Sequence, residues 1–258
     1  MKKKERKYSD IEIMATTAAK QIEDGKSVFV GTGLPMIATI LAQKTHAPNI
    51  LIVFEAGGFG PQIPVLPISV GDSRTFYNGL VASSMHEAMS AAQSGHIDYG
   101  FLGAAQIDMY GNINTTVIGM YDKPNVRLPG SGGGNDVGSL CHRTVTIMRQ
   151  DKKRFVKKLD FLTTPGYLAG AGSREKVGLP EDTGPYRVIT QLGVYGFDNE
   201  SKKMKLLTIN PGITIEEIKE NCEFDLIIPD EVESSLEPTQ KDIDMLKEVD
   251  PTGIVIRR

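Results

Sequence analysis

A carboxylate stands at the end of the apolar run over residues 50–54, and it is the first feature of the sequence that could do chemistry. Glu55 follows Ile-Leu-Ile-Val-Phe and precedes Ala56, Gly57 and Gly58. If the run is a strand of an α/β sheet, its carboxyl end borders the crevice in which ligands bind. The glycines let another backbone or a bulky acyl group approach closely. This placement suits a nucleophile, although a strand that stops in a turn with a solvated glutamate has the same pattern.

The second feature is the glycine-rich segment Gly130-Ser131-Gly132-Gly133-Gly134. Its successive main-chain N–H groups, with few side chains in the way, form a nest that can hold negative charge. A plain flexible turn has the same composition, and the segment alone supports both interpretations equally. Together with Glu55 it indicates acyl transfer, in which the carboxylate attacks a carbonyl and the nest stabilises the tetrahedral oxyanion. A thioester is the plausible electrophile, because a thiolate leaves far more readily than an amine.

Helix and strand alternate in the part of the sequence that must position these groups. Asp10 can cap a helix of apolar residues at helical spacing that ends by Gly25. Alternation of this kind is typical of a mostly parallel sheet covered by helices. We therefore predict an α/β fold, a mostly parallel sheet with helices on both faces. The expected elements are helices near 10–22, 36–43 and 84–93 and strands at 27–30, 50–54, 74–77 and 97–102.

From residue 108 onward the composition and the hydrophobic pattern of the sequence change. Residues 108–134 are rich in Gly, Asn, Thr and Pro without periodicity, and a connection of this length usually belongs to a site. The other expected elements are strands at 144–148 and 159–163, a short antiparallel meander over 187–210 with a turn at 198–201, and helices near 214–221 and 239–249. Without an internal repeat or a low-complexity linker, we expect one domain over 1–258, with 1–9 as a flexible arm.

The composition argues against several classes of function. A net charge of -3 gives no field that would gather nucleic acid. No apolar run approaches the roughly 18 residues that cross a bilayer, and the basic start lacks the apolar stretch of a signal peptide. The 2 cysteines cannot form a disulfide framework, and the 4 histidines lack the spacing of metal ligands. We therefore expect a cytoplasmic protein with no nucleic acid partner, no membrane partner and no metal.

Longer motifs make the sequence similar to a known family. Residues 103–114, which read Gly-Ala-Ala-Gln-Ile-Asp-x-Tyr-Gly-Asn-Ile-Asn, are followed by the Gly-Ser-Gly-Gly-x-Asn of residues 130–135. This combination resembles the B subunits of family I CoA-transferases of the glutaconate CoA-transferase type. The similarity extends over nearly the whole chain and includes residues 31–35, 69–72, 164–166 and 178–185. It implies the fold of this family and the transfer of CoA from an acyl-CoA to a carboxylic acid.

The resemblance also implies roles for particular residues. Glu55 matches the glutamate of an E-x-G strand-end motif, which attacks the acyl-CoA and becomes a glutamyl-CoA thioester in a ping-pong reaction. Residues 130–133 are similar to the oxyanion-hole loop that lies against the CoA arm, and Gln106 lies in a motif beside the site. CoA is then a substrate, no cofactor is permanently bound, and a homologous A-type chain supplies much of the pocket. One departure is Ala56, where many relatives carry Asn or Ser.

Two other functions fit the same residues. Related heterodimers of this fold resemble ring-opening or thioester hydrolases, in which water completes the reaction. In the third interpretation the chain is a non-catalytic scaffold whose glycine loops only shape an interface. A dicarboxylic substrate needs a cation near its distal end, and the sequence offers Arg74, Lys123 and Arg127 without choosing among them. The basic stretch 152–158 could meet the phosphates of a nucleotide-bearing cofactor, but a charge run of this length is usually a solvated face, and we interpret it so.

Overall fold

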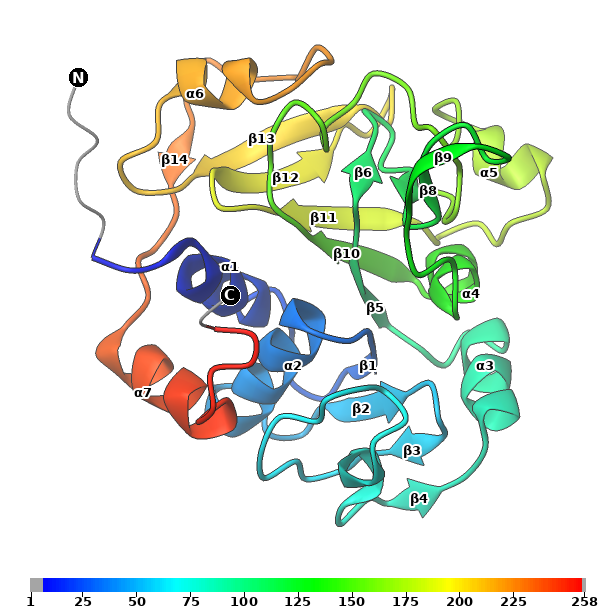
Figure 1. Cartoon of the computed structure of the whole chain (residues 1–258), viewed down its shortest axis with the longest axis vertical. Coiled ribbons are helices and arrows are strands. Elements are labelled where there is room, and N and C mark those ends of the chain that lie inside the picture. The colour runs from blue at the N-terminus through cyan, green and yellow to red at the C-terminus, as the bar shows by residue number, and fades with distance from the viewer. Residues whose placement is uncertain (1–6, 257–258) are drawn as a thin grey trace.

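Parallel strands form the centre of the largest sheet (Figure 1). The structure, a computed structural model, describes residues 7–256. In sheet order the central strands are β11 (Pro185–Ile189), β10 (Arg143–Ile147), β5 (Tyr99–Gly103), β1 (Ser27–Val30) and β2 (Leu51–Phe54), each parallel to the next. Their carboxyl ends therefore all lie at the same end of the sheet, which is where open α/β sheets bind ligands.

Antiparallel strands extend the sheet on both sides. β2 pairs with β3 (Gly58–Phe59), and β3 pairs with β4 (Val81–Ala82). On the other side, β12 (Gly193–Phe197) and β13 (Met204–Ile209) continue from β11 as a meander, and β14 (Glu233–Ser234) runs parallel to β13. Separate short pairs are β6 (Gln106–Ile107) with β7 (Ile113–Asn114), and β8 (Val117–Gly119) with β9 (Pro124–Arg127). The predicted mostly parallel sheet with a C-terminal meander is confirmed.

Helices cover both faces of the parallel strands. Val28 and Val30 pack on one face in a cluster with α1 (Asp10–Ala19), α2 (Leu34–Thr45) and α7 (Gln240–Val249). Phe29, which lies between them, packs on the other face with α3 (Met85–Gln93) and α4 (Gly134–Leu140). In Figure 1 the first group of helices lies to the left and α3 and α4 lie to the right. The shorter helices are α5 (Ser173–Lys176) and α6 (Ile215–Glu220).

The start of α1 differs from the expectation. Ser9, and not Asp10, caps the helix, because its hydroxyl accepts a hydrogen bond from the N–H of Glu12 at 3.2 Å. The Glu12 side chain in turn accepts from the N–H of Ser9 at 2.8 Å, which completes a capping box. Of the expected N-terminal arm, residues 1–6 lie outside the described residues, and Tyr8 packs against the core. The single-domain organisation stays a prediction.

Two predicted strands are wrong. Residues 74–77 belong mostly to a 3-10 helix, η1 (Ser73–Phe76), because the Asp72 side chain caps it and accepts from the N–H of Arg74 at 2.9 Å. Residues 159–163 form no strand, since the N–H groups of Thr163 and Thr164 both donate to the carbonyl of Ile113 and leave only an isolated bridge. Residues 108–134 contain β7, β8 and β9, which are too short to produce periodicity.

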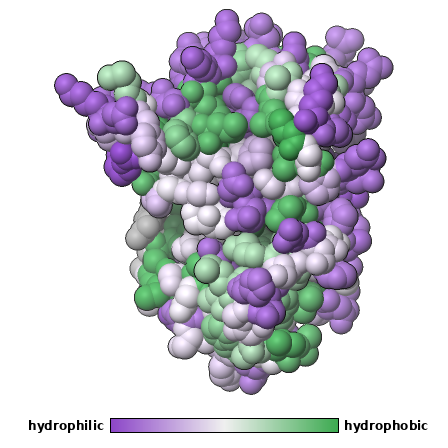
Figure 2. All heavy atoms as spheres, turned by 90° about the vertical axis from the view of Figure 1, so that its right-hand side faces the viewer, coloured by the Kyte–Doolittle hydropathy of each residue, from purple (hydrophilic) through white to green (hydrophobic). Residues whose placement is uncertain are grey.

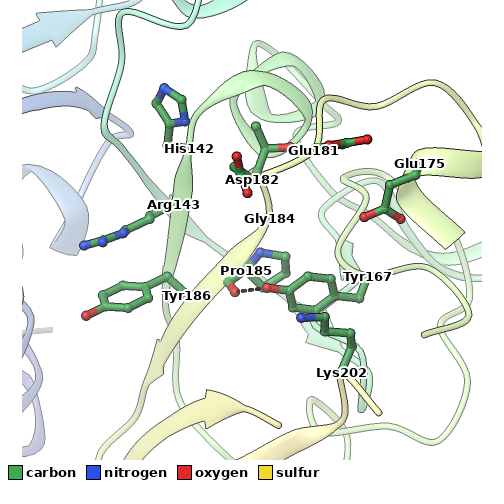
Figure 3. A pocket seen from close by; sticks show the side chains of 11 residues that line it. His142, Arg143, Tyr167, Glu175, Glu181, Asp182, Gly184, Pro185, Tyr186 and Lys202 are labelled. Atoms are coloured by element: carbon green, nitrogen blue, oxygen red, sulfur yellow. Dashed lines mark hydrogen bonds between the residues drawn. The ribbon is translucent and has the colours of Figure 1, made fainter. Parts of the chain in front are cut away.

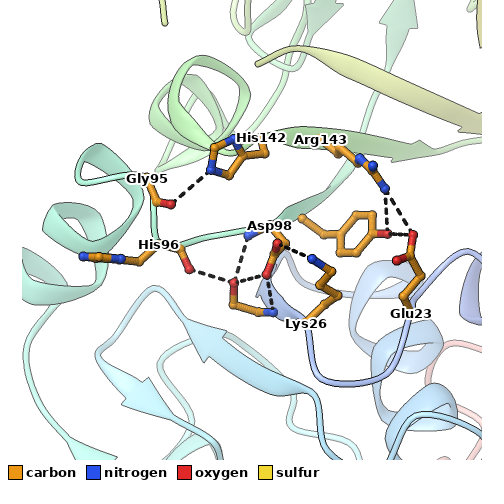
Figure 4. A network of polar contacts seen from close by, with 9 residues as sticks. Glu23, Lys26, Gly95, His96, Asp98, His142 and Arg143 are labelled. Carbon is orange, nitrogen blue, oxygen red and sulfur yellow. Dashed lines mark hydrogen bonds and ion pairs between the residues drawn. The ribbon is translucent and has the colours of Figure 1, made fainter. Parts of the chain in front are cut away.

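A polar network ties together the amino ends of the parallel strands (Figure 4). Asp98, directly before β5, accepts hydrogen bonds from the N–H and the hydroxyl of Ser27, both at 2.9 Å, and forms an ion pair with Lys26 at 3.0 Å. Partial burial opposes ionisation of Asp98, but these contacts outweigh it and hold the pKa of the carboxyl below its usual value. The network therefore joins β1 and β5 at the end opposite to their carboxyl ends.

We expect Asp98→Ala to lower the free energy of unfolding by about 1–2 kcal/mol at pH 7, because it removes hydrogen bonds to a charged group. Lys26→Met is the control and should cost less than about 1 kcal/mol, since the ion pair is partly exposed. The contribution of Asp98 is present above an unfolded-state pKa of about 4 and is lost as the pH falls through the lowered folded-state pKa. Urea unfolding between pH 3 and pH 7 measures this, and a difference that grows as the pH falls contradicts it.

Candidate functional site

A cavity of about 380 Å³ lies at the carboxyl ends of β1, β2 and β5. Glu55 follows β2, and residues 130–134, here called the glycine loop, lead into α4, of which Gly134 is the first residue, so the predicted carboxylate and nest lie in one wall. Apart from Glu55 and Arg154 the lining is uncharged and mostly small. It consists of Gly31, Thr32, Glu55, Val70, residues 102–105, Thr115, residues 128–134, Arg154 and Thr164.

The Glu55 carboxylate is held by the glycine loop. Its Oε1 accepts a hydrogen bond from the N–H of Gly133 at 3.1 Å, and the side chain is half-buried. A Cβ on Gly133 would lie 3.3 Å from both Cδ and Oε1 of Glu55. Glycine is therefore the residue that lets the N–H approach the carboxylate without pushing it aside. Oε2 accepts no hydrogen bond from residues 7–256 and is available to a ligand.

The glycines after Glu55 are required by close backbone packing. Gly57 has a φ of 103°, and a Cβ there would lie 2.5 Å from the main-chain carbonyl of Ser83. A Cβ on Gly58 would lie 2.1 Å from the carbonyl oxygen of Thr75. Real side chains do not fit at such distances, so the backbone beyond the carboxylate presses directly on its neighbours. The position of Glu55 is thereby fixed from its own strand as well as from the glycine loop.

The glycine loop leaves main-chain donors free. Thr115 fixes its start, since the N–H of Gly130 donates to the Thr115 carbonyl at 2.9 Å and the Thr115 hydroxyl donates to the Gly130 carbonyl at 2.8 Å. Within the described part of the chain, the N–H groups of Ser131 and Gly132 donate to no protein acceptor. They lie in the same short segment as the Gly133 N–H that holds Glu55. These donors can therefore serve an oxyanion that forms beside the carboxylate.

Gln106 lies behind the wall of the cavity and does not line it. The side chain is 5% exposed, donates to Asp160 at 2.9 Å and accepts from the side chain of Asn114 at 2.7 Å. Asn114 is adjacent to Thr115, which holds the glycine loop. Gln106 thus supports the residues that line the cavity but does not line the cavity itself.

The Asp-x-Tyr-Gly-Asn motif of residues 108–112 also builds the wall. The Asn112 carbonyl oxygen Oδ1 accepts from the N–H groups of Gly166 and Leu168 at 2.8 and 3.0 Å, and its Nδ2 donates to Asp108 at 2.8 Å. Burial raises the pKa of Asp108 above its usual value. A Cβ on Gly166 would lie 2.3 Å from the main chain of Gly111, so the two segments touch backbone to backbone. The motif thereby fixes the segment that carries Thr164 into the cavity.

A buried arginine holds the far end of α4. Arg174 is 2% exposed, and its guanidinium donates to the carbonyls of Gly138 and Ser139 at 3.2 and 3.1 Å and of Gly166 at 2.9 Å. Burial lowers its pKa, yet a cation is favourable at the carbonyl end of a helix. Because the glycine loop enters the amino end of this helix, Arg174 joins the loop to the segment of Thr164. The sequence contains no local signal for this contact.

The cation in the cavity is not one of those that the sequence offered. Arg74 pairs with Asp72 at 2.5 Å, Arg127 donates to the carbonyl of Tyr121 at 3.0 Å, and neither they nor Lys123 line the cavity. Arg154 does line it, so the interpretation of the basic stretch 152–158 as a solvated face is wrong for this residue, whereas the four lysines of the stretch are exposed as expected. Of the five basic side chains in this stretch only that of Arg154 turns inward, which is too little for a sequence pattern.

A second and larger hollow, of about 560 Å³, lies at the amino ends of β10 and β11 (Figure 3). Its lining mixes both signs of charge, with Arg143 and Lys202 beside Glu175, Glu181 and Asp182. It contains neither the nucleophile expected from the sequence nor the glycine loop. We therefore take the cavity at the carboxyl ends as the candidate site.

Residues 7–256 contain no group of three or more His, Cys, Asp or Glu side chains that could hold a metal ion. Two of the histidines instead contact main-chain carbonyls, His46 that of Ile22 and His142 that of Gly95. Over the same residues, every helix is too short or too polar to cross a membrane.

Residues 11–221 match the family described as Coenzyme A transferase. The B subunit of the 3-oxoadipate CoA-transferase of Pseudomonas knackmussii is 37% identical over 93% of this chain and 92% of its own length. The B subunit of the glutaconate CoA-transferase of Acidaminococcus fermentans is 38% identical over 88% and 86%. The crystal structure of glutaconate coenzyme A-transferase from that organism superimposes with a TM-score of 0.91, at 35% identity, over 97% of this chain and 98% of the other.

A more distant relative has a different activity. The cholesterol ring-cleaving hydrolase IpdB subunit of Mycobacterium tuberculosis is 24% identical over 94% of this chain and 95% of its own. A B-type chain of similar length thus belongs to a hydrolase in that organism.

We expect Gly133→Ala to lower the acyl-transfer activity anticipated from the sequence by roughly 10- to 100-fold, because displacing a reacting group by a fraction of an ångström is costly. The new Cβ would lie 3.3 Å from Glu55 and 2.5 Å from the terminal methyl of Met89. Steady-state kinetics of the single variant and of Gly133→Ala with Met89→Ala separate the two contacts. Recovery in the double variant would assign the loss to Met89 and contradict the role given to the Glu55 contact.

Proposed function

The chain belongs to the coenzyme A transferase family, and from that premise we propose that it is a B-type subunit that moves CoA from an acyl-CoA to a carboxylic acid. The observation that carries this proposal is the contact at 3.1 Å between the Glu55 carboxylate and the N–H of Gly133 inside the cavity. A carboxylate beside main-chain donors is the arrangement that covalent acyl transfer needs.

In the first half of the proposed reaction, Oε2 of Glu55 attacks the thioester carbonyl. The oxyanion that forms is stabilised by the N–H groups of Ser131 and Gly132, which have no other acceptor among the described residues. The C–S bond breaks, and CoA leaves as a thiolate. This leaves a mixed anhydride between the acyl group and Glu55. The thiolate then attacks the glutamyl carbonyl, which releases the donor acid and gives a glutamyl-CoA thioester.

The second half of the reaction reverses these steps with a new acid. The acceptor carboxylate attacks the glutamyl thioester, the thiolate leaves again, and a new mixed anhydride forms. Attack of the thiolate on the acceptor's carbonyl carbon gives the new acyl-CoA and restores Glu55. No proton is gained or lost in the net reaction. The hydrogen bond from Gly133 orients the carboxylate throughout, and Gln106, through Asn114 and Thr115, positions the glycine loop.

We propose a homologous A-type chain as the partner. The similar proteins of Pseudomonas and Acidaminococcus are named as B subunits, which supports this pairing. The face that carries α3, β4 and the β8–β9 hairpin shows hydrophobic areas among hydrophilic ones (Figure 2). It includes Leu80, Val81, Met85, Met120 and Val126, which are 50–77% exposed. Apolar side chains that gather on one face mark interaction surfaces, and we propose this face as the contact with the partner.

The names of the relatives also guide the choice of substrate. Glutaconate and 3-oxoadipate are both dicarboxylates, so we propose the CoA ester of a short dicarboxylic acid as donor or product. We further propose a cytoplasmic location. Both cysteines are buried free thiols, Cys141 with its pKa raised to about 12 and Cys222 to about 11 by burial. A reducing compartment preserves such thiols.

We expect Glu55→Gln to reduce transfer by the assembled pair of chains by about 10⁴-fold or more, because the amide keeps the shape of the side chain but is no nucleophile. Asp136→Asn, an exposed acid in the helix that follows the glycine loop, is the matched control for loss of charge. Initial rates with and without an acceptor acid measure both variants and the wild type.

Each result has a distinct meaning. Transfer near the wild-type rate in Glu55→Gln would leave the chain a scaffold. Rapid loss of the thioester by the wild type without any acceptor would identify a hydrolase. Strict dependence on an acceptor, with ping-pong kinetics, supports the transferase.

A further inference from the structure

Among the residues that the structure describes, Arg154 is the only one with a basic side chain that lines the cavity. The other charged group there is Glu55, and the rest of the lining is small and mostly apolar, with Val70, Leu102, Ala104 and Leu128. A ligand that brings a second negative charge into this space is repelled by the Glu55 carboxylate. A cation must offset this repulsion. The cavity therefore has one place for an acyl carbonyl and a separate place for an anion.

The fold delivers Arg154 to this position through its main chain. The N–H of Ile107 donates to the Arg154 carbonyl at 2.7 Å, and the N–H of Val156 donates to the Ile107 carbonyl at 3.0 Å. Phe155 between them is fully buried and stacks on Phe224. Because Ile107 follows directly on the segment that continues β5 into the cavity wall, the arginine is fixed at the same wall.

The guanidinium of Arg154 uses only one of its three nitrogens in a hydrogen bond within the described residues. Its Nε donates to Asp151 at 3.0 Å, which orients the planar group. In the described part of the chain, neither Nη1 nor Nη2 contacts a protein acceptor. The two free nitrogens form a fork that matches the two oxygens of a carboxylate. Asp151 thus orients the guanidinium through one nitrogen of Arg154, and the other two nitrogens can bind a planar anion.

We propose that Arg154 binds the distal carboxylate of the acyl group and makes the enzyme specific for dicarboxylic acyl-CoA esters. This inference rests on the proposed function, since it needs the thioester carbonyl at Glu55. The apolar lining then contacts the methylene groups between the two ends. A CoA phosphate is the other anion that Arg154 can meet, and the experiment below separates the two.

The test compares two thioesters that differ only at the distal end. Glutaryl-CoA carries a carboxylate where valeryl-CoA carries a methyl group, and both are assayed for transfer to acetate by the complex with its A-type partner. We expect the wild type to have a kcat/KM at least about 100-fold higher for glutaryl-CoA, because a site built around a polar group rejects an analogue that lacks it.

Arg154→Met should lower kcat/KM for glutaryl-CoA by about 100-fold or more and change that for valeryl-CoA by less than about 3-fold. Arg154→Lys should restore part of the activity on glutaryl-CoA, since it keeps the charge but not the fork. Lys152→Met removes the same charge from an exposed position of the same stretch and should affect neither substrate. The main-chain bonds of residue 154 persist in all variants, and thermal unfolding checks that they fold.

Three results overturn the inference. An equal loss on both thioesters in Arg154→Met assigns the arginine to CoA, which the two substrates share. If Arg154→Met loses activity on neither thioester, or if the wild type prefers valeryl-CoA, then Arg154 does not bind a distal carboxylate. In all three cases the wild type still transfers CoA, so the proposed function survives. Absence of transfer from either thioester with every acceptor tried would instead remove the proposed function.

Discussion

The hydrogen bond between the N–H of Gly133 and the Glu55 carboxylate is the contact on which the rest of the site depends. It joins two segments 78 residues apart and is sensitive to a side chain at position 133, since a Cβ would crowd the carboxylate at 3.3 Å. From one side, the buried strand β2 delivers the glutamate. From the other, Thr115 holds the start of the glycine loop and Arg174 holds the end of the helix that follows it. These contacts place a charged group beside free main-chain donors before any substrate arrives.

Polar groups are used differently at the two ends of the parallel strands. At the amino ends, both carboxylate oxygens of Asp98 accept hydrogen bonds from within the protein and join β1 to β5. At the carboxyl ends, Oε2 of Glu55 and two nitrogens of Arg154 have no acceptor or donor among residues 7–256. Polar groups left unused by the fold are those that a ligand can engage, and the proposed chemistry and specificity both use groups at this end of the sheet.

Much of this arrangement could be predicted from the sequence, because it depends on local patterns. Glu55 after an apolar run and the nest at residues 130–134 identified both halves of the wall, and alternating elements predicted the parallel sheet. The predictions that failed concern residues whose positions depend on contacts that the local sequence does not reveal. Arg154 lines the cavity only because Phe155 pairs beside Ile107, and Gln106 lies behind the wall because Asn114 and Asp160 take up its amide. The strand expected at 74–77 failed because a side chain, that of Asp72, caps a 3-10 turn.

In the proposed reaction the carboxyl group of Glu55 becomes covalently bonded to CoA, and mass spectrometry of the assembled complex can detect this thioester. The complex is mixed with an acyl-CoA, quenched within the first turnovers and digested. We expect the peptide containing Glu55 to gain the mass of CoA less one water, and we expect this gain to disappear when an acceptor acid is added before quenching. Product that accumulates while this peptide keeps its unmodified mass would contradict the account.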